Sequence, residues 1–179
     1  AFGNDNQPGA NAVYAKPKLV NKSLNRYPAK SVVTAFNKTA KGYVITKIES
    51  IENQMLYDAF WAARSKMVKL IGDNKLNERK LWHGTGNENV MQLVEQEGFR
   101  KEFNKTAMYG KGTYFARDAK YSVGYSSNNN GQYKMFQCKV LAGEMHQGNG
   151  GFQLNSWPKK NGGKGLIYDS LVDNTNNPS

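Results

Sequence analysis

The stretch Leu-Trp-His-Gly-Thr at 81–85 decides how this 179-residue chain folds, together with Gly-Lys-Gly-Thr-Tyr-Phe-Ala at 110–116. Both stretches predict short strands that place a polar ring, His83 in the first and Tyr114 in the second, beside glycines without side chains. Few ordinary core strands combine these two features. We therefore expect the strands to converge on a cleft that grips a flat ligand.

Helices are predicted on both sides of 81–85. Asn53 is a suitable N-cap, and apolar residues then recur at three- and four-residue steps from Leu56 to Leu70. This stripe, together with Trp61, is expected to lie in the core. A second helix is predicted from Asn87 to a stop at Gly98. Its first turn directly follows the strand, where backbone N–H groups can bind an anion or an amide oxygen.

The remaining segments mix short strands and helices, which predicts an α+β fold rather than a βαβ repeat. Residues 1–27 are rich in Asn, Gly, Pro and Lys and predict a flexible arm or extended lead-in, followed by one domain over 28–179. Further predictions are a helix from Pro28, strands at 43–48, 134–142 and 165–172, a turn at 128–131, a turn or short helix at 119–125, and a loop at 99–110 that covers the pocket.

Composition limits the partners. The net charge of +11 and pI near 9.6 suit anionic partners such as nucleic acid, acidic protein segments or a dinucleotide, and equally suit a lysine-rich solvated surface. The single Cys138 and two His argue against a disulfide or a metal site. No apolar run reaches the ~20 residues of a membrane span. We expect a cytoplasmic or nuclear location and no membrane partner.

His83 could act as a general base, a metal ligand or a fixed hydrogen-bond partner. The third role fits best, because the sequence offers no hydrolase-type nucleophile elbow. Beside it, Gly84 can offer backbone N–H and C=O groups to a planar amide.

Two tyrosines are candidates to enclose a flat ring. Tyr114 and Tyr125 could sandwich it while the Ser122 hydroxyl bonds its polar substituent, and such stacking contributes about 1 kcal/mol beyond burial. The alternative is structural: Tyr114 lies in a buried strand, and Tyr121 and Tyr125 are surface rings of a helix.

Taken together, the motifs resemble the catalytic domain of poly(ADP-ribose) polymerases, the diphtheria-toxin-like ADP-ribosyltransferases, and most closely the mono-ADP-ribosyltransferases. The resemblance runs in order from Pro28 to Ser179. Its motifs are 81–85, Gly98-Phe99, 110–116, Tyr121-Ser122-x-x-Tyr125, Val140-Leu141-x-Gly143 and 168–173, preceded by Lys47-Ile48-Glu49-Ser50-Ile51-Glu52-Asn53.

The resemblance implies two packed, mostly antiparallel sheets flanked by helices, with an NAD cleft between them. It implies that His83 holds a ribose hydroxyl of NAD and that Gly84 and Ser122 bond the nicotinamide amide. The loop from Lys101 to Tyr109 corresponds to the family's donor loop over NAD. The catalytic candidates are thus His83 and Tyr114, and the NAD-binding candidates are His83, Gly84, Thr85, Asn89, Arg100, Tyr109, Tyr114, Ser122 and Tyr125.

The resemblance also has a gap. The family's third signature position, Glu in polymerising members and usually apolar in mono-transferring ones, lies on a strand just after the segment that resembles Asn177-Pro178-Ser179. The domain is therefore expected to be truncated before its last strands.

Three functions are compatible with this pattern. The first is an NAD-dependent transferase that moves ADP-ribose onto a protein or nucleic-acid acceptor and releases nicotinamide, with mono-transfer favoured over chain building. The second is an inactive family member that binds NAD or protein. The third is an enzyme like the NAD-dependent RNA 2′-phosphotransferases, which should show clustered Arg residues, whereas Lys predominates here.

Overall fold

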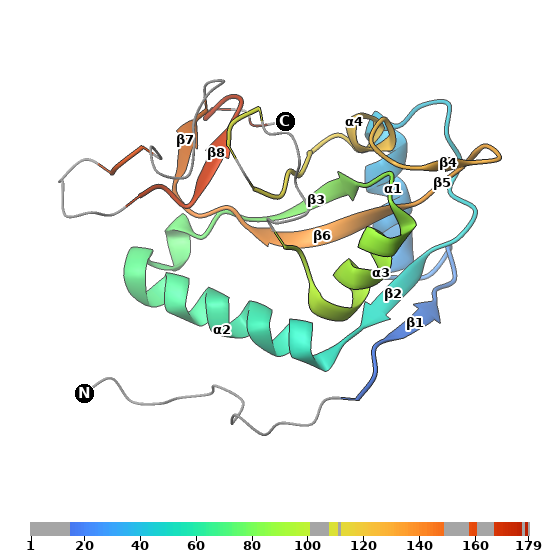
Figure 1. The fold of residues 1–179 in the computed structure, drawn as a ribbon, viewed down its shortest axis with the longest axis horizontal. Coiled ribbons are helices and arrows are strands. Elements are labelled where there is room, and N and C mark those ends of the chain that lie inside the picture. The colour runs from blue at the N-terminus through green and yellow to red at the C-terminus, as the bar shows by residue number, and fades with distance from the viewer. Residues whose placement is uncertain are drawn as a thin grey trace.

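The computed structural model describes residues 15–100, 108–110, 112–148, 158–160, 167–176 and 178. Helices and short strands are mixed along the chain, which confirms the α+β class (Figure 1). The elements are β1 (Lys18–Asn21), α1 (Ala29–Thr39), β2 (Glu49–Glu52), α2 (Gln54–Ile71), the 3₁₀ turn η1 (Asp73–Lys75), β3 (Glu78–Gly84), α3 (Glu88–Glu97), α4 (Ala119–Val123), β4 (Asn128–Asn129), β5 (Gln132–Tyr133), β6 (Met135–Leu141), β7 (Met145–Gln147) and β8 (Ser170–Val172).

The strands of the described residues form four two-stranded sheets, not the two larger packed sheets that the resemblance implies. The pairs β1–β2, β3–β6 and β4–β5 are antiparallel, and β7–β8 is parallel. The predicted turn at 128–131 is confirmed, since Asn130 and Gly131 have positive φ angles of 51° and 81° between β4 and β5.

The pair β3–β6 lies at the centre, above α2 and α3 in Figure 1. Its register places Trp82 opposite Gln137 and His83 opposite Phe136. Because Trp82 and His83 are consecutive on β3, their rings project from opposite faces of the sheet. Each face has its own core. One consists of Phe36, Ala40, Trp82 and Ala119, and the other of Met91, Val94 and Phe136.

The predicted caps of the two central helices are confirmed. The Asn53 side chain accepts a hydrogen bond from the backbone N–H of Leu56 at 3.2 Å, and α2 ends at Gly72, whose φ is 86°. Asn87 caps α3 in the same way, and Gly98 ends it with a φ of 82°. Asn53 also donates to the carbonyls of Glu95 and Gln96 at 2.9 Å, which joins the start of α2 to the end of α3.

One sequence prediction near the N-terminus is wrong. Residues 43–48 form no strand, and Val44 is 85% exposed. The strand begins at Glu49 and pairs with Lys18–Asn21, a segment predicted to be a flexible or extended lead-in. The alternation of apolar and polar residues at 43–48 suited a strand, but a strand forms where the chain finds a partner to pair with. Here the partner, Lys18–Asn21, lies opposite Glu49–Glu52 and has no recognisable sequence pattern. The division of the chain at residue 27 stays a prediction.

The apolar stripe of α2 is less buried than predicted. No residue of α2 is fully buried, and Leu70 and Trp61 are 71% and 38% exposed. Lys139 lies over the Trp61 ring at 5.3 Å and Arg64 at 5.6 Å, so cations cover part of this face. Within the described part of the chain, no helix has the length and apolarity that a bilayer span requires.

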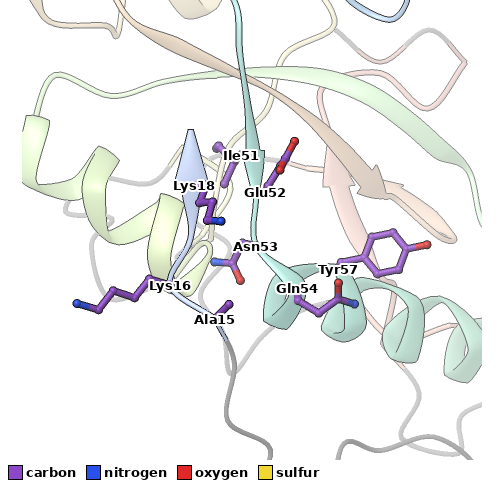
Figure 2. A pocket seen from close by; sticks show the side chains of 8 residues that line it. All are labelled: Ala15, Lys16, Lys18, Ile51, Glu52, Asn53, Gln54 and Tyr57. Carbon is purple, nitrogen blue, oxygen red and sulfur yellow. The ribbon is translucent and has the colours of Figure 1, made fainter. Parts of the chain in front are cut away.

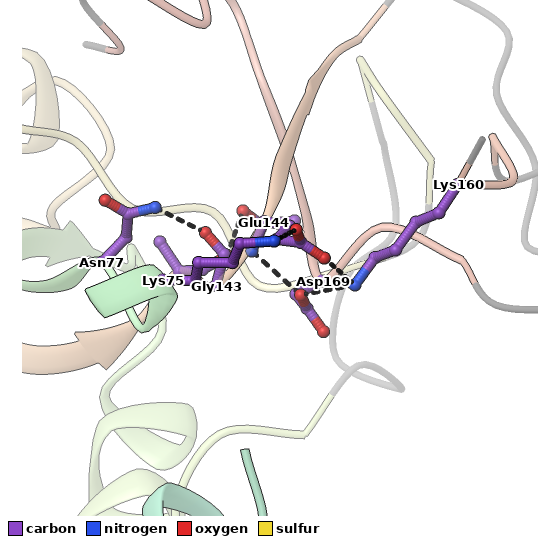
Figure 3. Close-up of polar contacts among 8 residues, drawn as sticks. Lys75, Asn77, Gly143, Glu144, Lys160 and Asp169 are labelled. Atoms are coloured by element: carbon purple, nitrogen blue, oxygen red, sulfur yellow. Dashed lines mark hydrogen bonds and ion pairs between the residues drawn. The ribbon is translucent and has the colours of Figure 1, made fainter. Parts of the chain in front are cut away.

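The β7–β8 pair is tied to η1 by a charged cluster, defined here as Lys75, Glu144, Lys160 and Asp169 (Figure 3). Glu144 accepts hydrogen bonds from Lys75 at 2.9 Å and from Lys160 at 2.7 Å. These bonds lower the pKa of the Glu144 carboxyl, and the bond from Lys160 is the larger cause. The predicted last strand is confirmed over Ser170–Val172, while 161–166 lie outside the described residues.

Strand β6 confirms the prediction for 134–142. Phe136 is buried and Cys138 is half-buried on the same side, beside the Met91 and Val94 cluster. Burial raises the pKa of the Cys138 thiol to about 12. A thiol with that pKa is protonated at neutral pH, so Cys138 packs and does not act as a nucleophile.

Candidate active site

The end of β3 and the segment before α4 lie side by side. Trp82 and Ala116 exchange two backbone hydrogen bonds, of 2.7 and 2.8 Å. One residue further along, the His83 ring donates from Nδ1 to the carbonyl oxygen of Tyr114 at 2.7 Å. The two stretches that the sequence singled out are therefore adjacent, as predicted. The prediction of a second strand is wrong, because the described residues of 110–116 form no strand and only Ala116 makes an isolated bridge to Trp82.

The His83 ring is held by aromatic neighbours. Its centroid lies 4.9 Å from that of Phe99 and 5.6 Å from that of Phe115. Burial lowers the pKa of His83, outweighing the bond to Tyr114, which raises it. A neutral ring that donates from Nδ1 leaves Nε2 as an acceptor, which can accept a hydrogen bond from a ligand hydroxyl. Sequence reasoning missed this aromatic support, although both phenylalanines belong to the motifs quoted above.

Gly84 lies against α4 so closely that no side chain fits. A Cβ on Gly84 would lie 2.0 Å from the Ser122 carbonyl oxygen and 2.6 Å from the Ser126 hydroxyl. The glycine therefore permits β3 and α4 to touch. Ser122 itself is buried, with 3% of its surface exposed. The structure thus brings Gly84 and Ser122 together, and adds Ser126, which no sequence motif indicated.

The Tyr114 hydroxyl is engaged with its own chain. It accepts from the backbone N–H of Tyr109 at 2.8 Å and donates to the carbonyl oxygen of Gly110 at 2.8 Å. Its only proton is thus committed, although 38% of the residue is exposed. The Tyr109 ring packs on Gly148, where a Cβ would lie 2.7 Å from it. Residues 101–107 of the loop predicted to cover the pocket lie outside the described residues.

Tyr125 and Tyr121 form an exposed pair on and just after α4. Their hydroxyl oxygens lie 3.1 Å apart and their ring centroids 5.3 Å apart at 50°. The hydrogen bond to Tyr125 is the largest cause that raises the pKa of Tyr121. Each ring is 58% exposed. This exposure fits both interpretations of the sequence, in which Tyr125 is either a surface ring or a ring that covers a ligand.

The other candidates lie at or beyond the start of α3. Thr85 follows β3, and its hydroxyl accepts from the Asn87 backbone N–H at 3.5 Å. Asn89 is exposed in the first turn of α3, and its backbone N–H bonds the Asn87 side chain at 2.9 Å. Arg100 follows α3 and pairs with Glu97. No contact described by the structure joins Asn89 or Arg100 to His83.

Two hollows are described, and neither contains the candidate residues. One, of about 470 Å³, lies between β1 and the start of α2 (Figure 2). The other, of about 420 Å³, lies between α1 and the face of β3 opposite His83. Among the described residues, no group of three or more His, Cys, Asp or Glu side chains could hold a metal ion.

Comparison with known protein families matches residues 28–159 to the poly(ADP-ribose) polymerase catalytic domain. The chain belongs to this family. His83, Gly84, Tyr114, Ser122 and Tyr125 lie within the matched range, and the family implies the ADP-ribosyltransferase fold.

Curated relatives agree with that assignment. Human protein mono-ADP-ribosyltransferase PARP12 is 37% identical over 145 residues, which is 80% of this chain and 20% of the relative. Human PARP14 is 36% identical over 155 residues, or 83% of this chain and 8% of the relative. Human PARP11 is 33% identical over 168 residues, which is 82% of this chain and 49% of the relative. The chain spans half or less of each of these proteins.

Proposed function

We propose that this chain is the catalytic domain of an NAD-dependent transferase that moves single ADP-ribose units onto a protein acceptor and releases nicotinamide. The observation that carries the proposal is the neutral His83 ring, fixed by its bond to Tyr114 beside the bare backbone of Gly84. Support for mono-transfer comes from relatives named protein mono-ADP-ribosyltransferases. The expected compartment, cytoplasm or nucleus, belongs to the same proposal.

NAD is proposed to bind in a cleft at the end of β3. His83 Nε2 would accept a hydrogen bond from a ribose hydroxyl, and Gly84 and Ser122 would bond the nicotinamide amide. The rings of Tyr114 and Tyr125 would enclose the nicotinamide. The proposed residues on the adenosine and diphosphate side are Thr85, Asn89, Arg100 and Tyr109.

The reaction needs a fixed leaving group more than an acid or base. The bond from ribose C1′ to the nicotinamide nitrogen breaks with its electron pair on nicotinamide, so the sugar becomes oxocarbenium-like. A nucleophilic atom of the acceptor then attacks C1′ from the opposite face and loses its proton. Holding the ring and ribose in place favours this path by orientation. Because each proposed contact is a hydrogen bond or ring contact, no metal is invoked.

Transfer of label from radiolabelled NAD to acceptor proteins tests the proposal. His83→Ala should lose transfer while circular dichroism shows the fold retained, whereas Lys66→Ala, an exposed change on α2, should keep it. Undiminished labelling in His83→Ala would refute the assignment. A nicotinamide analogue that raises the melting temperature without any transfer to any acceptor would instead indicate a binding module.

A further inference from the structure

The hollow of about 420 Å³ between α1 and β3 gathers positive charge. Its lining contains three cations, Lys38, Lys80 and Arg117, and one carboxylate, Asp118. Arg117 already pairs with Asp118, with 3.1 Å between Nε and Oδ1. That pair is neutral in sum, so the two lysines leave the hollow with two positive charges.

Lys38 and Lys80 have no ion pair among the described residues, and they come from different elements. Lys38 is in the last turn of α1 and Lys80 is on β3. The contrast with Lys139 is informative, because Lys139 lies directly opposite Lys80 in the β3–β6 register. Lys139 forms an ion pair with Glu78 at 3.2 Å, a carboxylate that it shares with Arg64, whereas Lys80 faces the hollow without a carboxylate partner in the described chain.

The rest of the lining suits a small polar ligand. Trp82, 4% exposed, forms an apolar floor, and Gln137 and Thr39 contribute an amide and a hydroxyl. A concave site of a few hundred Å³ with convergent polar groups is typical of small-molecule binding. Phosphate oxygens are the acceptors that lysine ammonium groups bind as point charges.

We propose that this hollow binds a small molecule through its phosphate groups, at a site separate from the one at His83. Trp82 and His83 are consecutive on β3 and project from opposite faces, so the two sites share a strand without sharing space. The ligand bridges α1 and β3 by accepting hydrogen bonds from Lys38 and Lys80. This inference does not depend on transferase activity.

Amide chemical shifts of the ¹⁵N-labelled chain, titrated with inorganic pyrophosphate, test the site. Saturable shifts are expected at Lys80, Arg117 and Gln137, and they should persist in His83→Ala. Lys80→Glu and Lys38→Glu should each weaken binding at least about tenfold, since each removes a charged hydrogen bond. Lys66→Glu makes the same change of net charge on the exposed surface of α2 and should bind like the wild type.

Equal affinity of Lys80→Glu and Lys66→Glu would overturn the proposal, as would shifts confined to residues around His83 and Tyr125. Melting curves of the lysine variants should match the wild type, so that a loss of binding is not a loss of fold. A nucleoside diphosphate that shifts the same amides at lower concentration than pyrophosphate would support the site and indicate a nucleotide as its source. If pyrophosphate binds more strongly than the nucleoside diphosphate, the result would support the site and indicate a phosphate ligand that carries no nucleobase.

Discussion

The two faces of β3 differ in burial and in chemistry. On one face Trp82 is 4% exposed and packs edge-on against Phe36, with ring centroids 5.7 Å apart. On the other, His83 is half-buried beside Phe99 and keeps one ring nitrogen for a ligand. A period of two residues thus lets one strand support the fold and present a reactive group. Perturbing one face at a time should separate stability from function.

The largest effect is expected on the Trp82 face. Trp82→Ala removes a buried indole from the cluster with Phe36 and Ala119, and should lower the free energy of unfolding by about 3–5 kcal/mol. Urea titration would measure the loss. Leu70→Ala, at a side chain 71% exposed, is the control and should change it by no more than about 0.5 kcal/mol. Similar losses in both variants would contradict the assignment of the core.

Gly84→Ala should have the next largest effect, because it acts where β3 meets α4. The added methyl group would lie 2.0 Å from the Ser122 carbonyl oxygen, and backbone must move to admit it. We expect destabilisation of about 1–3 kcal/mol and loss of transfer activity. Gly112→Ala is a matched control, since its Cβ would meet nothing within 4 Å. Full activity in Gly84→Ala would show that this contact is not required.

Local sequence signals were enough to predict the two helices next to β3. Asn53 and Asn87 are side chains that cap helices, and Gly72 and Gly98 adopt the positive φ that ends them. Because each of these signals acts within a few residues, α2 and α3 were predicted correctly. The motif order also identified the family before any contact was known.

Features that depend on distant partners could not be predicted. Strand β2 exists because Lys18–Asn21 pairs with it, across α1 in the sequence. The exposure of Trp61 depends on what packs against α2, which periodicity does not reveal. The Tyr114 ring was expected beside a ligand ring, and no sequence pattern indicated the two bonds of its hydroxyl to the backbone of Tyr109 and Gly110, which arise from loop geometry.

Those two bonds give a third prediction, of smaller size. Tyr114→Phe removes both bonds that hold 109–110 and should cost about 1–2 kcal/mol. If the proposed function holds, KM for NAD should rise more than kcat falls, because the ring remains. Tyr133→Phe makes the same chemical change at an equally exposed residue, 38%, in the β4–β5 hairpin. It should leave KM unchanged, and equal KM values in the two variants would contradict this role for the hydroxyl.

The smallest effect should appear in the pH dependence of stability. Burial lowers the pKa of His83 below its ordinary 6.5 in the folded chain. Below pH 6.5 the unfolded chain therefore binds more protons, so the free energy of unfolding should fall on acidification, by at most about 1.4 kcal/mol per pH unit. Above that pH the effect should vanish. Melting temperatures between pH 5 and 8 would measure it against His83→Asn, which retains His146 as a common background. If the two curves run parallel, the ring is as easily protonated in the folded chain as in the unfolded one, and the neutral acceptor assigned to this face of β3 is wrong.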